Sequence, residues 1–377
     1  MGQFSITTAY RYAPAKDISV FDYTQVIFAA MGVALMIIAS RFPIGFYRRF
    51  AGMVMLAAIV LLLLVLVGGK KVNGARRWFE LAGVTFQPSE IVKIAFIFVG
   101  AATLEKIQTT KHITRYAVFA VVCIGLLFLM RDLGTALIFF VTFLVISFMR
   151  SGSFATVLLS ASGAGLAAFI AVTARPYIAG RFATWGHAWE LYNEGGYQQT
   201  RTMTACASGG LFGLGQGKGW FKTVFAADTD MVFGVVAEEM GLILAFSCVI
   251  AIVILAFYAV RSVSTARSSF YAIAASAAVT IFMAQLSLNV FGSLDILPFT
   301  GVTFPFLSKG GTSLIAAWGL LSFVKAADTR PGASFAVPEA GKERPRRRKK
   351  REKREAQEDA ALEASQNAAQ IPPETAR

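Results

Sequence analysis

Charged residues are scarce in this sequence. Lys, Arg, Asp and Glu make up 15% of its 377 residues, whereas a soluble globular domain contains about 25%. This shortage excludes an ordinary soluble domain. Apolar residues make up 56% of the chain, and long apolar runs recur at close to the length of about 20 residues that a helix needs to cross a bilayer. We therefore expect an all-α integral membrane protein.

Cysteine and histidine are almost missing. Cys123, Cys206 and Cys248 are far apart and show no paired spacing, so they indicate neither a disulfide framework nor a zinc site. His112 and His187 are equally isolated. Metal chemistry based on His and Cys is therefore excluded. The N-terminus also lacks the charged start, short apolar stretch and small-residue cleavage site of a cleavable signal.

Acidic residues are in the minority, which leaves a formal net charge of +14. The excess is concentrated, because residues 342–354 hold ten Lys or Arg and two Glu. A basic run after the last apolar segment is an orientation signal that contacts anionic lipids, so we expect membrane lipids as partners and no nucleic acid. The predicted organisation is an extracytoplasmic segment at 1–21, a membrane domain at 22–326 and a disordered cytoplasmic tail at 327–377.

Nine membrane helices are predicted from the apolar runs. Their ranges are 22–40, 51–68, 88–104, 115–130, 133–149, 154–174, 232–260, 268–290 and 312–326. Alternate connections are rich in Lys and Arg, which keeps short loops in the cytoplasm. The segments that then lie outside are the N-terminus, 69–87, Arg131 with Asp132, 175–231 and 291–311. We expect a multi-pass inner-membrane protein with a cytoplasmic C-terminus, and a further helix before Met1.

Cations gather in one stretch on the side that should hold few of them. Residues 69–87 contain Lys70, Lys71, Arg76 and Arg77, opposed by Glu80. A pocket for a pyrophosphate headgroup would explain them, because Arg offers a planar fork of donors that matches phosphate oxygens. The alternative is that these side chains extend to ordinary lipid phosphates.

Two ionisable residues lie near the start of the predicted helix at 88–104. Glu90 follows Pro88, and Lys93 is three residues further on, which places both on one helical face. Charges on a membrane helix are costly unless they are paired or face a polar cavity. The residues therefore indicate either a functional cavity or an ion pair that locks helices together.

The stretch 175–231 is the longest predicted outer segment, and such length indicates function. It holds aromatic residues suited to sugar stacking or to an interfacial belt, namely Trp185, Trp189, Tyr192 and Tyr197, and a glycine-rich run at 209–219 that permits close approach to a ligand. The stretch 175–231 ends at Asp228 and Asp230, which either cap the next helix or take part in catalysis. Glu238 and Glu239 follow inside that helix, where carboxylates are functional by default.

Pro and Gly interrupt the apolar stretch at 297–313. Irregular backbone at membrane depth is tolerated where protein or a water-filled cavity surrounds it. The stretch is therefore interpreted as a re-entrant segment that lines a cleft, with Lys309 as a phosphate ligand. A simple external loop is the alternative.

Several of these blocks together resemble the SEDS family of cell-wall polymerases, whose members include FtsW, RodA and SpoVE. The blocks are NGARRWFELAGVTFQPSEIVK at 73–93, RDLGTALI at 131–138, GGYQQTRTMTACASGGLFGLGQG at 195–217, DTDMVFGVVAEEMG at 228–241 and LPFTGVTFPFLSKGGTS at 297–313. Their order and spacing cover nearly all of residues 22–326. The resemblance implies a peptidoglycan glycosyltransferase that polymerises lipid II, releases undecaprenyl pyrophosphate, and works beside a class B penicillin-binding protein.

The resemblance also implies roles for individual residues. Asp230 would be the catalytic carboxylate that accepts the proton of the acceptor sugar hydroxyl. The implied substrate- and pyrophosphate-binding residues are Arg76, Arg77, Glu90, Lys93, Gln198, Ser308 and Lys309, with Glu238 and Glu239 in support. Charge on the leaving group would be neutralised by fixed cations or by a divalent cation, Mg²⁺ or Mn²⁺.

The chain departs from the family pattern at two motifs. Lys309 stands where the family commonly has Tyr in SYGGSS, and Asp230 is followed by MVFG where the family has FIFA. These changes concern the geometry of donor binding. A lipid II flippase, in which intramembrane charges and broken helices also occur, and a non-catalytic division scaffold remain the alternative functions.

Overall fold

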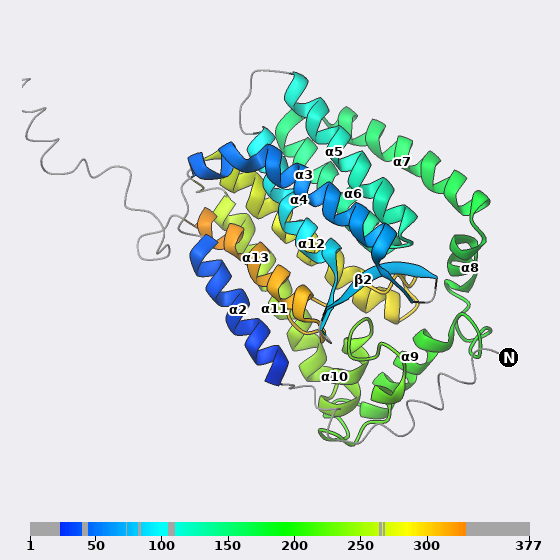
Figure 1. The fold of residues 1–377 in the computed structure, drawn as a ribbon. Helices are drawn as coiled ribbons and strands as arrows, with labels where there is room; N and C mark the ends of the chain where they lie inside the picture. Colours follow the sequence, from blue (N-terminus) through cyan, green and yellow to red (C-terminus); the bar gives the residue numbers. More distant parts are fainter. Residues whose placement is uncertain are drawn as a thin grey trace, which may run out of the picture. The chain divides into compact units, whose positions relative to one another are not determined.

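A computed structural model of the chain describes residues 23–39, 44–72, 74–81, 84–104, 110–263, 266 and 268–328. The predicted N-terminal segment lies outside these residues, as does all of the predicted tail beyond Asp328. The described chain is mainly helical with one small sheet (Figure 1). This confirms the predicted all-α membrane fold class.

Helices α2 to α7 follow the order predicted from the apolar runs. Their bounds are α2 Tyr23–Ala39, α3 Ile44–Gly68, α4 Pro88–Leu104, α5 Thr110–Leu129, α6 Leu133–Ser151 and α7 Phe154–Ala174. Asp132 caps α6, because its side chain accepts a hydrogen bond from the Thr135 N–H. The buried carboxylate of Asp132 is thereby fixed at this end of the helix bundle.

The predicted outer stretch 175–231 contains helices of its own. They are α8 Pro176–Thr184, α9 Tyr197–Gly209 and the 3-10 helix η3 Phe221–Thr223. The chain then continues through α10 Val232–Met240, α11 Leu242–Val263, α12 Ser269–Ser293 and α13 Gly311–Ala327. The segment 294–310 between α12 and α13 has no helix or strand, in agreement with the irregular backbone expected there.

The prediction of one continuous helix at 232–260 is wrong, because the chain breaks at Gly241. Gly241 has φ +89°, and a Cβ built on it would lie 2.2 Å from the carbonyl oxygen of Leu211. The Leu242 N–H donates to the Gly210 carbonyl at 2.9 Å. A glycine with positive φ thus ends α10 and lets the glycine-rich run pack directly against the break.

Residues 70–86 form a three-stranded antiparallel sheet in the order β1-β2-β3, a structure that the apolar pattern did not indicate. The strands are β1 Lys70–Val72, β2 Ala75–Leu81 and β3 Val84–Phe86. Successive side chains of a strand point to opposite faces. Accordingly, Arg76 is exposed and Arg77 is buried.

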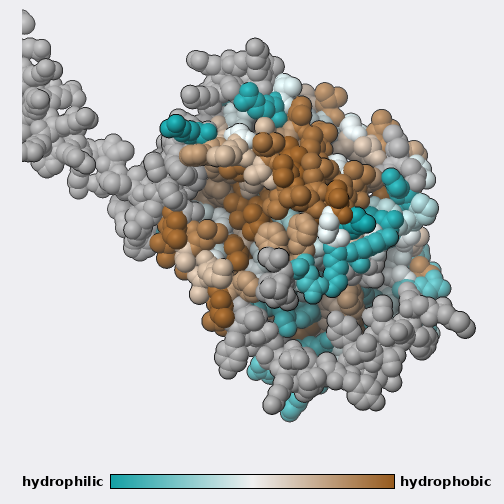
Figure 2. Space-filling view, in the orientation of Figure 1, coloured by the Kyte–Doolittle hydropathy of each residue, from teal (hydrophilic) through white to brown (hydrophobic). Residues whose placement is uncertain are grey.

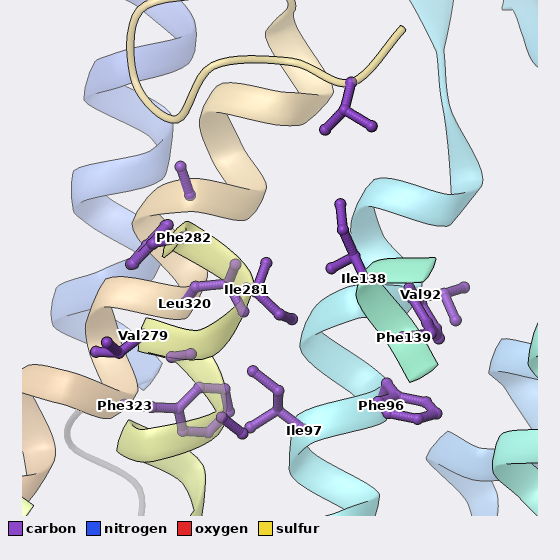
Figure 3. Close-up of a cluster of buried hydrophobic side chains, with 14 of the residues drawn as sticks. Val92, Phe96, Ile97, Ile138, Phe139, Val279, Ile281, Phe282, Leu320 and Phe323 are labelled. Carbon is purple, nitrogen blue, oxygen red and sulfur yellow. The ribbon is translucent and has the colours of Figure 1, made fainter. Parts of the chain in front are cut away.

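Helix α12 runs through the middle of the bundle and packs against α4, α6, α11 and α13 (Figure 1). The apolar core lies along these contacts. Figure 3 shows Phe96 and Phe139 meeting on one side and Phe282 with Leu320 on the other. The ring centroids of Phe96 and Phe139 are 4.5 Å apart. This packing joins α4 to α6 and α12 to α13.

Large apolar side chains also cover the outside of the described helices. Leu158, Leu159 and Phe169 on α7 are 60–76% exposed, as expected for contact with lipid chains. Figure 2 shows a hydrophobic surface bounded by hydrophilic side chains over the sheet. Among the residues that the structure describes, four helices are long and apolar enough to cross a membrane: Arg49–Gly68, Leu133–Ser151, Leu242–Val263 and Ser269–Ser293. The predicted number of nine spans stays a prediction.

Candidate active site

Asp230 lies in the turn before α10, against the irregular segment 294–310. Its backbone N–H donates to the Ala226 carbonyl at 3.0 Å, and its backbone carbonyl accepts from Asn289 Nδ2 at 2.9 Å. Gly301 faces its carboxylate. A Cβ built on Gly301, whose φ is +68°, would lie 2.9 Å from Asp230 Oδ2. Glycine therefore lets the backbone come close to this carboxylate.

Two side chains tie the irregular segment to the turn before α10. Asn289 Nδ2 donates to the Val302 carbonyl at 2.7 Å as well as to the turn. Ser308 Oγ donates to the Thr229 carbonyl at 2.5 Å and accepts from the Phe304 N–H at 2.7 Å. The position of the carboxylate is thus set by contacts from both α12 and the segment that follows it.

Arg77 brings a buried cation from β2 to the same end of the bundle. Its Nη2 donates to the Arg131 carbonyl, and its Nη1 lies 3.9 Å from Asp132 Oδ1. Within the described part of the chain, the buried Nε of Arg77 has no hydrogen-bond partner. Such a donor costs about 1–3 kcal/mol, which an anionic oxygen of a ligand would offset.

Arg181 is a second cation, and the sequence does not single it out. It projects from α8, and its Nη1 donates to the Phe299 carbonyl at 3.0 Å. Burial lowers the pKa of Arg181, and the neighbouring Arg77 lowers it further, while Asp132 and Asp230 oppose the change. Four charged side chains therefore lie close together: Arg77 from β2, Arg181 from α8, Asp132 from the α6 cap and Asp230 from the turn before α10.

The pKa of the Asp230 carboxyl is raised above its usual value. Burial raises the pKa of this carboxyl to about 6, against the opposing effects of Arg77, the Thr229 hydroxyl and Arg181, and with a smaller increase from Asp132. A group with this pKa is mostly ionised at neutral pH and still basic enough to accept a proton. These are the properties of a general base.

Glu90 and Lys93 form a buried ion pair on α4, with Lys93 Nζ 2.7 Å from Glu90 Oε2. Ser89, at the start of the same helix, donates from Oγ to Asp132 Oδ2 at 3.4 Å. The first turn of α4 is thus connected to the cap of α6. The ion pair follows Ser89 directly along α4. Its role in substrate binding stays a prediction.

Arg76 does not join Arg77. Its Nη1 donates to the carbonyls of Leu66 at 3.2 Å and Val67 at 2.9 Å. These are unsatisfied carbonyls at the C-terminal end of α3, where a cation is favoured by the helix dipole. The two arginines therefore lie on opposite faces of β2 and do not form a single clamp.

Lys309 and Gln198 both contact the stretch that leads to α10. The Lys309 N–H donates to the Asp228 carbonyl at 2.8 Å, and its Nζ lies 3.9 Å from Asp228 Oδ2. Gln198 Nε2 donates from α9 to the Phe225 carbonyl at 3.0 Å. Both residues hold the chain just before the candidate base.

Glu238 and Glu239 hold the glycine-rich run in place. Glu238 accepts hydrogen bonds from the N–H groups of Trp220 at 3.1 Å and Phe221 at 3.0 Å, the start of η3. Glu239 Oε1 lies 2.8 Å from Lys222 Nζ. Both carboxylates are buried, and their predicted supporting role in the reaction stays a prediction.

The carboxylates of the site do not form a protein-built metal centre. In the described ranges no group of three or more His, Cys, Asp or Glu side chains is arranged to hold a metal ion. Asp132 is engaged by the Thr135 N–H at the α6 cap and by Arg77. The described residues therefore do not fit a metal centre built by the protein.

The fold and the site together define a multi-pass membrane protein in which a carboxylate and two guanidinium groups lie close together at one end of the helix bundle. The chain belongs to the FtsW/RodA/SpoVE family, described as cell cycle protein, which matches residues 3–330. It is 31% identical over 306 residues to the probable peptidoglycan glycosyltransferase FtsW of Coxiella burnetii, covering 77% of this chain and 82% of that relative.

Solved structures show the same relationship. The structure described as "Structural coordination of polymerization and crosslinking by a peptidoglycan synthase complex" contains a chain with 27% identity, a TM-score of 0.69, and coverage of 85% of this chain and 92% of that one. The rod shape determining protein RodA of Thermus thermophilus matches with 27% identity, a TM-score of 0.58, and coverage of 80% and 85%. The predicted family is therefore confirmed.

Proposed function

We propose that this chain is a peptidoglycan glycosyltransferase that polymerises lipid II into glycan strands. The enzyme class agrees with the names of its relatives. The observation that carries the proposal is the position of Asp230, whose carboxylate lies against Gly301 and interacts electrostatically with Arg77 and Arg181. A base beside two guanidinium groups suits a reaction that removes a proton and releases a diphosphate.

The proposed reaction is a single displacement. Asp230 accepts the proton of an acceptor sugar hydroxyl while the hydroxyl oxygen forms a bond to the anomeric carbon of the donor. The bond between that carbon and the phosphate oxygen breaks, and the electron pair leaves with undecaprenyl pyrophosphate. Arg77 and Arg181 neutralise the charge that develops on the leaving group. Attack opposite to the leaving group inverts the anomeric centre.

We place the site at the outer face of the bacterial inner membrane, with the C-terminus in the cytoplasm. The distribution of Lys and Arg among the loops supports this orientation. A class B penicillin-binding protein is the proposed partner, and the likeness to a chain of a peptidoglycan synthase complex supports it. Such a partner would crosslink the strands that this chain makes.

The direct test supplies labelled lipid II to the protein purified with its transpeptidase partner. We expect glycan ladders from the wild type, and none from Asp230→Ala or Asp230→Asn. Glu194→Ala is the matched control, because Glu194 is an exposed acid in the same outer region. If the protein moves lipid II across the membrane and makes no polymer, the flippase is the better assignment. If the wild type is inactive but still binds its partner, the non-catalytic scaffold is the better assignment.

A further inference from the structure

A set of contacts fastens the turn after α8 to the chain just beyond α12. Asp295 Oδ1 accepts from the Gly186 N–H at 3.1 Å, and Asp295 Oδ2 accepts from the Ala188 N–H at 3.1 Å. Trp185 Nε1 donates to the Ile296 carbonyl at 3.0 Å. We call these three hydrogen bonds the Asp295 clasp.

The backbone at Asp295 is held in an unfavourable conformation. Its φ is +61°, in the left-handed region that costs a residue with a Cβ about 1–2 kcal/mol. Aspartate tolerates this region better than most residues. Strain of this kind persists where the surrounding structure enforces it and points to function. Here the strained residue aims both carboxylate oxygens at backbone donors of the opposite segment.

The clasp and the contact that Arg181 makes lie at opposite ends of the same pair of segments. Arg181 lies one turn before Trp185, and its hydrogen bond reaches Phe299, four residues after Asp295. The segments 181–188 and 295–299 therefore run beside each other, joined at both ends. At its start, α8 is further held by the guanidinium of Arg131, which lies 4.9 Å from the ring centroid of Tyr177.

We propose that Asp295 is a positioning residue for glycosyl transfer, which holds α8 so that Arg181 stays beside Asp230 and reaches the diphosphate of the departing lipid. This inference rests on the proposed function. Asp295 itself bonds only backbone N–H groups in the described chain, so its effect on the reaction passes through Arg181.

Asp295→Gly is the sharpest variant. Glycine adopts φ +61° without strain, so the variant keeps the turn and loses only the two hydrogen bonds of the clasp that the Asp295 carboxylate accepts. Hydrogen exchange then tests the clasp without reference to activity. We expect the Gly186 and Ala188 amides to exchange faster in Asp295→Gly than in the wild type. Exchange should be unchanged in Glu190→Gln, whose exposed side chain lies in the same segment.

Kinetics test the positioning role. Because Arg181 acts on charge that develops as the bond breaks, Asp295→Gly should lower kcat by about tenfold, within the range that misplacement of a catalytic group produces, and leave KM nearly unchanged. Asp295→Asn, which keeps one acceptor oxygen, should retain an intermediate kcat. In an Arg181→Ala background, Asp295→Gly should have no further effect on kcat.

The pH profile gives an independent readout. Asp230 is faced by Arg77 from β2, Asp132 from the α6 cap, Arg181 from α8 and the Thr229 hydroxyl. Withdrawal of the Arg181 charge raises the pKa of Asp230, so the acidic limb of the Asp295→Gly profile should move to higher pH. The proposal is wrong if Asp295→Gly has the kcat, the KM and the acidic limb of the wild type. It is also wrong if Asp295→Gly lowers kcat by the same factor in the Arg181→Ala background as it does alone. A wild type that makes no polymer would instead overturn the proposed function, while the exchange data still decide whether the clasp exists.

Discussion

Asp230 Oδ2 lies 2.9 Å from the position that a Cβ on Gly301 would take. The proposed base therefore faces a residue that has no side chain to block it. Gly301 also has φ +68°, so a substitution there adds backbone strain to the clash. This relationship links the 297–313 motif to the acidic motif before α10, and it gives the first prediction.

Gly301→Ala should reduce polymerisation by more than tenfold and lower stability by about 1–2 kcal/mol, the cost of a Cβ in the left-handed region. Glycan ladders and thermal unfolding in detergent measure the two effects. Gly163→Ala is the control, because no atom lies within 4 Å of a Cβ built on this residue of α7. Normal activity of Gly301→Ala would show that the carboxylate does not need this close approach.

Polymerisation should depend on the ionisation of Asp230. Burial raises the pKa of this group to about 6, and the base must be deprotonated to accept a proton. The rate should therefore be high above pH 6 and should fall about tenfold for each pH unit below it. Arg77→Ala should shift this limb to higher pH, because Arg77 is the largest influence that lowers the pKa of Asp230. A rate that stays level down to pH 4.5 would contradict the assignment of the base.

Breaking the ion pair between Glu90 and Lys93 should abolish most activity while leaving the protein inserted in the membrane. Glu90→Ala leaves a buried ammonium group without its partner, which costs about 3–5 kcal/mol. The double variant Glu90→Leu with Lys93→Leu should recover much of the stability, because apolar replacement of both partners is well tolerated. Membrane fractionation, thermal unfolding and glycan ladders measure the three properties.

The activity of the double variant then decides the role of the pair. An inactive but stable double variant would place the charges in substrate binding. Recovery of activity together with stability would make the pair purely structural.

Glu238→Ala should destabilise the outer region more than it affects the chemistry. The variant leaves the N–H groups of Trp220 and Phe221 without their acceptor, and each unsatisfied buried donor costs about 1–3 kcal/mol. Limited proteolysis should cut the glycine-rich run faster than in the wild type. Gly219→Ala should give a similar result, because its Cβ would lie 2.2 Å from Glu238 Oε2. Unchanged proteolysis in both variants would contradict this anchoring.

The departure of the chain from one continuous helix at 232–260 shows where apolar patterning is insufficient. The runs on both sides of Gly241 are mostly apolar, so hydropathy alone does not mark a helix break at this residue. The break follows from packing, since the carbonyl of Leu211 occupies the space that a helix with a side chain at 241 would need. The small sheet at 70–86 was missed for a related reason, because its strands of three to seven residues are too short to show a clear period.

The sequence by itself determined the class of protein, most helix positions and the family, because bilayer-length apolar runs and local motifs are properties of contiguous residues. It also indicated the acidic turn at 228–230 and the charged pair on α4. Only the tertiary structure decided which charges meet. About 50 residues of chain separate each member of the cluster from the next, in the order Arg77, Asp132, Arg181 and Asp230. The pleat of β2 places Arg76 and Arg77 on opposite faces of the strand. Long-range packing sets such encounters, and no local pattern encodes them.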